Sequence, residues 1–144
     1  LARQQAGPGA AVDANARAAA ARLLRFFDTT VARHHAHEER LLFPALLEAM
    51  AGSDAVCLRE LTRGLADEHR ELDAAWRRLR GALVRIAAGE PASLAPDAVD
   101  ALAMLYRRHI ECEDKELLPM VARLVADDEL LRIGRAMREG RDTG

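Results

Sequence analysis

Apolar residues recur at spacings of three and four along most of this chain, and this pattern constrains the fold most strongly. The clearest stripe consists of Leu58, Leu61, Leu65, His69, Leu72, Trp76, Leu79, Leu83 and Ile86. Such spacing places side chains on the buried face of a helix in an antiparallel bundle. The 30 Ala, 21 Leu, 20 Arg and 12 Glu residues favour helix, and no Val- and Ile-rich run alternates with period two. The sequence therefore predicts an all-α fold and excludes sheet folds.

Clusters of glycine, proline and aspartate divide the chain into helical segments. They are Gly7-Pro8-Gly9, Gly52-Ser53-Asp54, the stretch 89–96, Asp127-Asp128 and Gly140. Helices are therefore predicted over residues 13–50, 54–88, 97–126 and, as a short C-terminal helix, 128–138. Pro44 and Pro119 fall inside two of these segments, where we expect a kink or a break. With 144 residues, the chain has the size of one domain, residues 1–144.

The first ten residues differ from the rest of the chain. The sequence begins at Leu1 rather than at a methionine, and it reaches a breaker at Gly7. Residues 1–10 are therefore predicted to be the tail of an earlier helix and the loop that follows it. We expect this first helix to be largely absent from the chain, with most of it lying upstream.

Charge and cysteine content exclude several kinds of partner and place the protein in the cytoplasm. The 21 basic and 23 acidic residues are interspersed, and the net charge is −2. Neither nucleic acid nor a membrane surface is therefore an expected partner. Arg or Glu interrupts every apolar segment, so no membrane-spanning helix and no signal peptide is predicted. Cys57 and Cys112 suit a reducing cytoplasm better than a disulfide framework.

Five polar residues interrupt the apolar stripes of three different helices. They are His34, Glu38, His69, His109 and Glu113. In two of the helices a histidine precedes a glutamate by four residues, a step that brings both side chains to one face about a turn apart. A carboxylate in an apolar interior must be protonated, paired or coordinated to a metal. Three imidazoles and two carboxylates suit iron or manganese, and zinc is also compatible.

The two His-x-x-x-Glu motifs belong to an internal duplication. His34 and His109 each lie ten residues before a proline, so that Glu38 corresponds to Glu113. The residues that follow also correspond, with Glu39 matching Asp114. Each half should then contain a histidine-bearing helix followed by a His-x-x-x-Glu helix. The first half lacks its leading histidine, which we expect upstream of this chain.

These motifs resemble those of the hemerythrin-like (HHE cation-binding) family. The matching stretches are residues 34–44 (HHAHEERLLFP), 67–72 (DEHREL) and 109–119 (HIECEDKELLP). The resemblance implies an up-and-down four-helix bundle that holds two non-haem iron ions and binds or senses O2, nitric oxide, or redox or iron state. It also implies roles for the five inward residues. His34, His69 and His109 would be terminal ligands, and Glu38 and Glu113 would bridge the ions.

The chain departs from the oxygen-carrying branch of this family at two positions within its sequence. Asp73 stands where that branch has a second histidine on the helix of His69. That branch also has its last bridging carboxylate five residues after the histidine, which would be Asp114 here. The internal duplication favours Glu113 instead. Whether Asp114 replaces or joins Glu113 stays open.

Other residues near the motifs are given less direct roles. His35 is expected either beside the ligands or at the surface, and His37 is expected to face solvent. Glu39 and Asp114 are expected at the edge of the site, where they would accept hydrogen bonds from ligand imidazoles. For Cys112 a small buried apolar role is favoured over a redox role. Tyr106, one turn before His109, is interpreted as a core residue.

Three classes of function remain open at this point. The favoured hypothesis is a di-iron domain that binds or senses a small diatomic molecule and is not an enzyme. The alternatives are a di-iron oxidase, a peroxidase-like enzyme or an iron-handling repair protein, and a metal-free structural bundle whose inward carboxylates pair with arginines. The sequence also leaves open whether two copies form a homodimer.

Overall fold

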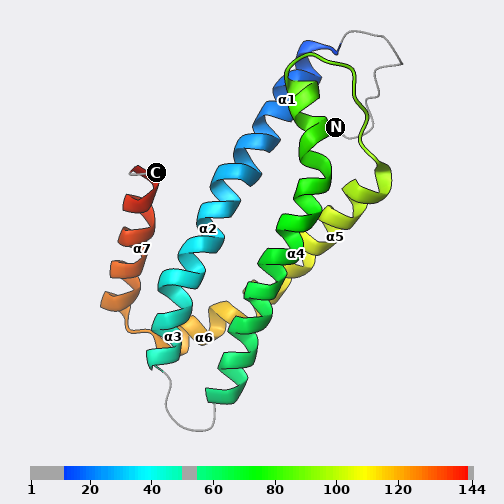
Figure 1. The fold of residues 1–144 in the computed structure, drawn as a ribbon. Helices are drawn as coiled ribbons and strands as arrows, with labels where there is room; N and C mark the ends of the chain where they lie inside the picture. Colours follow the sequence, from blue (N-terminus) through cyan, green and yellow to red (C-terminus); the bar gives the residue numbers. More distant parts are fainter. Residues whose placement is uncertain (1–11, 50–54, 143–144) are drawn as a thin grey trace. The chain divides into compact units, whose positions relative to one another are not determined.

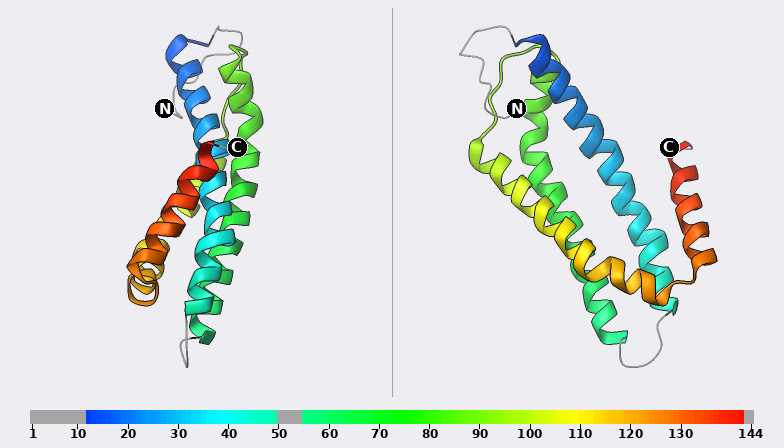
Figure 2. Two further views of the ribbon diagram at one scale, coloured as in Figure 1. Left: turned by 90° about the vertical axis from the view of Figure 1, so that its left-hand side faces the viewer. Right: turned by 180° about the vertical axis from the view of Figure 1, so that it is seen from behind.

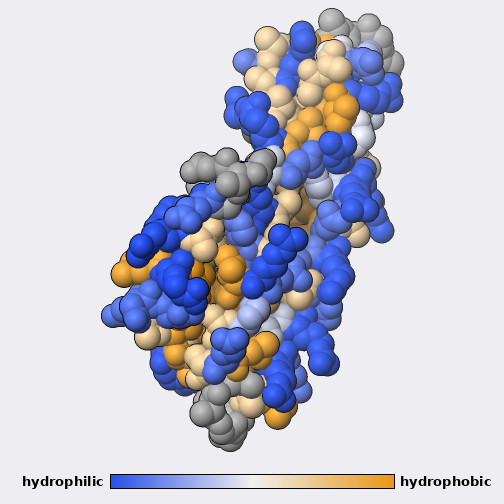
Figure 3. Space-filling view, turned by 60° about the vertical axis from the view of Figure 1, so that its left-hand side comes forward, coloured by the Kyte–Doolittle hydropathy of each residue, from blue (hydrophilic) through white to orange (hydrophobic). Residues whose placement is uncertain are grey.

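The computed structural model describes residues 12–49 and 55–142, and every regular element in these two stretches is helical. The prediction of an all-α fold is therefore confirmed (Figure 1). No described helix combines the length and the apolar character needed to cross a membrane. On the face shown in Figure 3, hydrophilic residues cover most of the surface and apolar residues gather in small groups. The proposed helix tail at residues 1–10 lies outside the described residues.

The helices follow the segments that the breakers predict. The first segment consists of α1 (Ala14–Arg25), η1 (Phe26–Val31), α2 (Ala32–His37), η2 (Glu38–Leu42) and α3 (Phe43–Ala49). The later elements are α4 (Ala55–Ala87), α5 (Pro96–Cys112), η4 (Glu113–Leu117), α6 (Leu118–Leu124) and α7 (Asp127–Asp142). Asp13 caps α1, because its carboxylate accepts a hydrogen bond of 2.7 Å from the backbone N–H of Ala16. The predicted short helix 128–138 is longer than expected, since α7 runs to Asp142.

Both helices that contain an internal proline depart from regular α-helical geometry just before it. The turns η2 and η4 are π-helical: the N–H of Phe43 donates to the carbonyl of Glu38, and that of Leu118 to Glu113. Proline has no N–H and its ring clashes with the carbonyl four residues earlier, so the preceding turn widens. Figure 2 shows the ribbon changing direction where α5 passes into α6. The predicted irregularities are therefore present, and each begins at the glutamate of a His-x-x-x-Glu motif.

The chain divides into two compact units. The histidine unit contains residues 33–69 and 107–144, and the tryptophan unit contains residues 1–32 and 70–106. The core of the histidine unit consists of Phe43, Leu46, Leu58, Leu65, Leu117, Val121, Val125 and Ile133. These residues come from α3, the first half of α4, the η4–α6 segment with its C-cap Val125, and α7. All five predicted metal-binding residues belong to this same unit.

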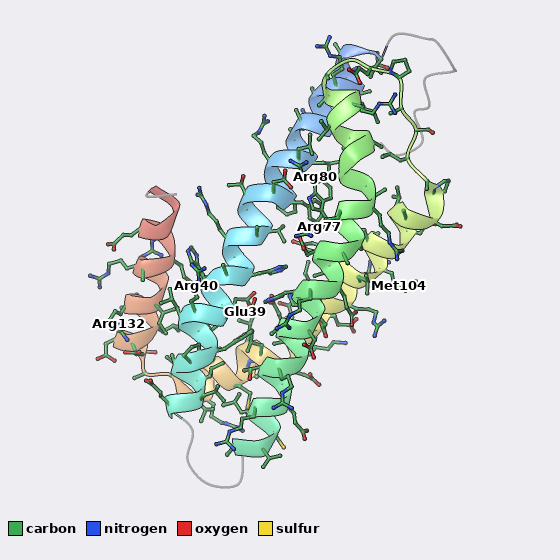
Figure 4. All side chains as sticks on the ribbon, viewed as in Figure 1. Glu39, Arg40, Arg77, Arg80, Met104 and Arg132 are labelled. Atoms are coloured by element: carbon green, nitrogen blue, oxygen red, sulfur yellow. The ribbon has the colours of Figure 1, made fainter. Side chains whose placement is uncertain are left out.

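An aromatic cluster and a part-buried hydrogen bond hold the tryptophan unit together. The ring of Trp76 stacks on Phe27 with centroids 4.6 Å apart, and Tyr106 contacts Phe27 edge-on at 5.7 Å. The Trp76 Nε1–H donates to Asp28 over 2.8 Å, and the Arg80 guanidinium donates to the same carboxylate (Figure 4). Interpreting Tyr106 as a core residue agrees with this packing. The hydrogen bond to Arg80 holds the pKa of Asp28 below its usual value.

Replacing Asp28 with alanine should destabilise the protein by about 1–2 kcal/mol at neutral pH, because the buried side chain of Trp76 would lose the acceptor of its indole N–H. Since the folded-state pKa of Asp28 is lowered, its contribution should be complete above the unfolded-state pKa and disappear as the pH falls through the folded-state value. Urea unfolding of both proteins across this range measures the effect. Asp73→Ala removes the exposed pair with Arg77 and should cost less than about 0.5 kcal/mol. Equal effects of the two substitutions would contradict this account.

Candidate metal centre

The two His-x-x-x-Glu motifs place their side chains together as the helical step of four predicts. His34 Nε2 lies 3.4 Å from Glu38 Oε1 on the helical stretch α2–η2. His109 Nε2 lies 3.0 Å from Glu113 Oε1 where α5 passes into η4. The π-helical turns begin at the two glutamates, so the irregular backbone coincides with the carboxylates. Such turns are frequent at functional sites.

His69 of α4 joins the two motifs. Its Nε2 lies 3.5 Å from Glu38 Oε1, the same oxygen that faces His34. The side chains of Glu38 and His109 are 2% exposed and that of His69 is 5% exposed, whereas His34 is 53% exposed. Phe43 stacks over His69 with ring centroids 6.2 Å apart, so an apolar wall closes one side of the site. Two imidazoles and a carboxylate are thus buried together.

Four buried atoms in this cluster have no hydrogen-bond partner. They are Glu38 Oε1, Glu113 Oε1, His69 Nε2 and His109 Nε2. Buried polar atoms almost always have a partner, so four orphans in one place require an explanation. The two glutamates contact histidines and each other. Cations bound in the cluster would give these atoms partners.

The outer nitrogens of the two buried histidines face carboxylates. His69 Nδ1–H donates to Glu39 over 3.1 Å, and His109 Nδ1–H donates to Glu68 over 2.9 Å (Figure 4 labels Glu39, which points toward α4). In a neutral imidazole, a proton on Nδ1 leaves the lone pair on Nε2, the nitrogen that points into the cluster. Each Nε2 lone pair then faces a carboxylate oxygen. These atoms repel one another unless a proton or a metal ion lies between them.

Of the two carboxylates expected at the edge of the site, Glu39 and Asp114, only Glu39 is found there. Glu39 lies at the edge of the cluster and contacts the imidazole of His69, one of the predicted ligands. Asp114 is exposed, and the partner of His109 is Glu68 instead. Sequence reasoning missed Glu68 although it directly precedes His69. One residue is a rotation of about 100° around the helix, and only the packing of neighbouring helices decides what such a residue faces.

His35 lies in the cluster, which the sequence left undecided. Its ring is parallel to that of His69, with centroids 3.8 Å apart and an interplanar angle of 8°, and it meets His109 edge-on at 5.2 Å. Burial, followed by the neighbouring histidines, lowers the pKa of His35 to about 3. The imidazole is therefore neutral at physiological pH. His37 is only partly buried and, unlike His35, belongs to neither group of potential ligands described next.

The potential ligand atoms form two groups that share one carboxylate. One group consists of His35, Glu38, His69 and His109, and the other consists of His34, Glu38 and Glu113. Within each group, every residue offers an atom within 4.8 Å of the others. All five residues singled out from the sequence are included. Asp73, which departs from the oxygen-carrier pattern, is half exposed and pairs with Arg77, so it belongs to neither group.

The two inward carboxylates are electrostatically strained without a cation. Burial, reinforced by the adjacent Glu113, raises the pKa of Glu38 to about 9. Burial alone would also raise the pKa of Glu113, but His109 and Glu38 outweigh it and lower that pKa to about 2. The pair therefore holds one proton near neutral pH, as expected when two carboxylates share a buried site. A divalent cation would replace this proton.

The pKa values of the two buried histidines, His69 and His109, shift in opposite directions. Burial lowers the pKa of His69. Burial would lower that of His109 as well, but Glu113 and Glu68 raise it.

Cys112 lies one turn beyond His109, and burial raises the pKa of its thiol to about 12. It packs against the core of the histidine unit, which fits the expected apolar role rather than a redox role.

The chain was compared with known proteins. The family model for the hemerythrin HHE cation-binding domain matches residues 1–121. No curated protein and no solved structure gave a match. The matched stretch covers most of the chain and includes every residue of the two ligand groups. The chain therefore belongs to the hemerythrin HHE cation-binding domain family.

Proposed function

We propose that this domain binds two non-haem iron ions through His34, Glu38, His69, His109 and Glu113. The observation that carries the proposal is the set of four buried, unpartnered atoms on Glu38, Glu113, His69 and His109. A metal-free bundle offers these atoms only the one proton that the two glutamates share. Membership of a cation-binding family and the buried His/Glu cluster fit metal binding independently of each other.

The donor set supports a dinuclear iron centre in particular. Imidazole nitrogens combined with carboxylate oxygens suit iron, and carboxylate-bridged metal pairs are commonly built between facing helices of bundles. Glu38 belongs to both ligand groups, which suits a carboxylate that bridges two cations. When bound, such a metal pair supplies redox-active sites with open coordination positions. We propose that the ligand taken there is a small diatomic molecule, O2 or nitric oxide, and that the domain binds or senses it.

Removing a central ligand should abolish metal binding. Protein loaded anaerobically with Fe(II) and desalted should retain close to two iron ions per chain, and Glu38→Ala or His69→Ala should lose most of them. Because a metal that binds only the folded state stabilises it, EDTA should lower the melting temperature of the loaded protein by about 5–10 °C.

Two controls accompany this measurement. Glu60→Ala alters an exposed glutamate of α4, and His37→Ala alters a histidine outside both ligand groups. Both variants should keep the metal content of the unmodified protein. Less than about 0.1 metal ion per chain for iron, manganese and zinc alike, with a melting temperature that ignores EDTA, would contradict metal binding.

The outer carboxylates should tune the affinity for metal without being ligands. Glu39→Gln and Glu68→Gln remove the charge that orients His69 and His109, and each should weaken metal binding about 10–100-fold. Competition with a coloured chelator measures the affinity. Asp114→Asn is the matched control, because Asp114 is exposed and lies outside both ligand groups. An equal loss in all three variants would indicate a general charge effect and contradict the orienting role.

The reaction of the reduced protein with gas tests the proposed ligand. Stopped-flow mixing of the Fe(II) protein with O2 or nitric oxide should produce a charge-transfer absorption band that disappears when the gas is removed. Repeated cycles should recover the original spectrum, since a binding or sensing domain releases its ligand unchanged. Irreversible oxidation with turnover of an added reductant would instead identify an oxidase or a peroxidase-like enzyme. No spectral change with either gas would contradict diatomic binding while leaving metal binding intact.

A further inference from the structure

Two adjacent histidines of α2 lie in different surroundings. His34 faces Glu38 along its own helix and has an exposed side chain. His35 is partly buried, stacks against His69 and meets His109 edge-on. It offers a ring nitrogen within 4.8 Å of one potential ligand atom each of Glu38, His69 and His109. The side chain nearer to the two buried imidazoles is therefore the one to which the sequence assigned no definite role.

The three residues grouped with His35 each carry a buried atom that has no hydrogen-bond partner. His69 Nε2, His109 Nε2 and Glu38 Oε1 belong to the same group as His35, and all three are buried without a hydrogen bond. Stacking alone explains the parallel rings of His35 and His69, but a phenyl ring would stack equally well. It does not explain why a ring nitrogen of His35 lies close to ligand atoms of three residues that each carry an unpartnered buried atom. A cation shared by the four residues explains this convergence of ligand atoms.

We propose that His35 is a metal ligand, together with Glu38, His69 and His109. The inference rests on the proposed metal binding and adds a ligand to it. The two metal positions then differ in chemistry. One has three imidazoles and a carboxylate, and the other has His34 with the carboxylates Glu38 and Glu113. Nitrogen-rich sites favour zinc and iron, whereas oxygen-rich sites favour manganese and magnesium, so the two positions should differ in their affinity for iron.

The substitution His35→Phe separates coordination from stacking, because phenylalanine keeps the aromatic ring and removes both nitrogens. Coordination predicts that this variant binds one metal ion per chain more weakly by more than about tenfold, while the other ion is retained. A purely structural role predicts unchanged metal content. His37→Phe is the matched control and should behave like the unmodified protein. The metal-free forms should have similar melting temperatures.

Failure of the inference can be distinguished from failure of metal binding. If the unmodified protein binds no metal, the proposed function fails and the inference fails with it. If it binds two ions, His69→Ala loses metal and His35→Phe does not, only the inference is overturned.

A second measurement needs no substitution at His35 and covers the case in which His35→Phe does not fold. The protein is labelled with 15N-histidine and loaded with Co(II), which shifts the NMR signals of coordinated imidazoles. Four of the five histidines should be shifted strongly, and assignment through His37→Phe should identify His37 as the unshifted one. Three strongly shifted histidines, with His35 among the unshifted, would overturn the proposal.

Discussion

The structure of the histidine unit depends on how the free-energy cost of burying two carboxylates beside imidazole lone pairs is offset. Glu38 is almost fully buried, and the oxygen that it turns inward is not hydrogen-bonded. Burial in an apolar interior costs a carboxylate several kcal/mol unless a counter-charge or a proton compensates. The surrounding core holds these side chains in place, because Leu65 lies one turn before His69 and Leu117 lies one turn after Glu113. The helices thus hold an electrostatic arrangement that a cation would complete.

Two carboxylates next to the cluster orient its buried histidines. Glu39 and Glu68 each accept the Nδ1 proton of a histidine on another helix, which leaves both Nε2 lone pairs inside the cluster. Each orienting carboxylate is a sequence neighbour of a proposed ligand, Glu38 in one case and His69 in the other. A single helical turn therefore carries a proposed ligand and also the carboxylate that orients a proposed ligand on another helix. The positions of the donors are set before any metal arrives, which lowers the cost of assembling the site.

Much of the fold and part of the site could be predicted from local sequence rules. The spacing of three and four in α4, with breakers at both ends, was enough to place that helix to within a residue or two. The step of four likewise placed His34 with Glu38 and His109 with Glu113. The prolines correctly marked irregular turns, although not their π-helical form. These features depend on residues close together in the chain.

Features that depend on contacts between helices could not be predicted in the same way. His35 and Glu68 each stand next to a predicted ligand, and a shift of one residue turns a side chain about 100° around its helix. Whether such a residue faces the cluster depends on the rotation of the helix against its neighbours. Stacking of His35 on His69 and acceptance of the His109 proton by Glu68 are outcomes of that packing.

Anomalous scattering from crystals of the iron-loaded protein would test the central claim most directly. Data collected on both sides of the iron absorption edge should give two peaks, one among His35, Glu38, His69 and His109, and one among His34, Glu38 and Glu113. Such peaks would show that the buried carboxylates and imidazoles are there to hold metal. The absence of any peak in these positions, with Glu38 and Glu113 instead sharing a proton in a direct hydrogen bond, would contradict the account.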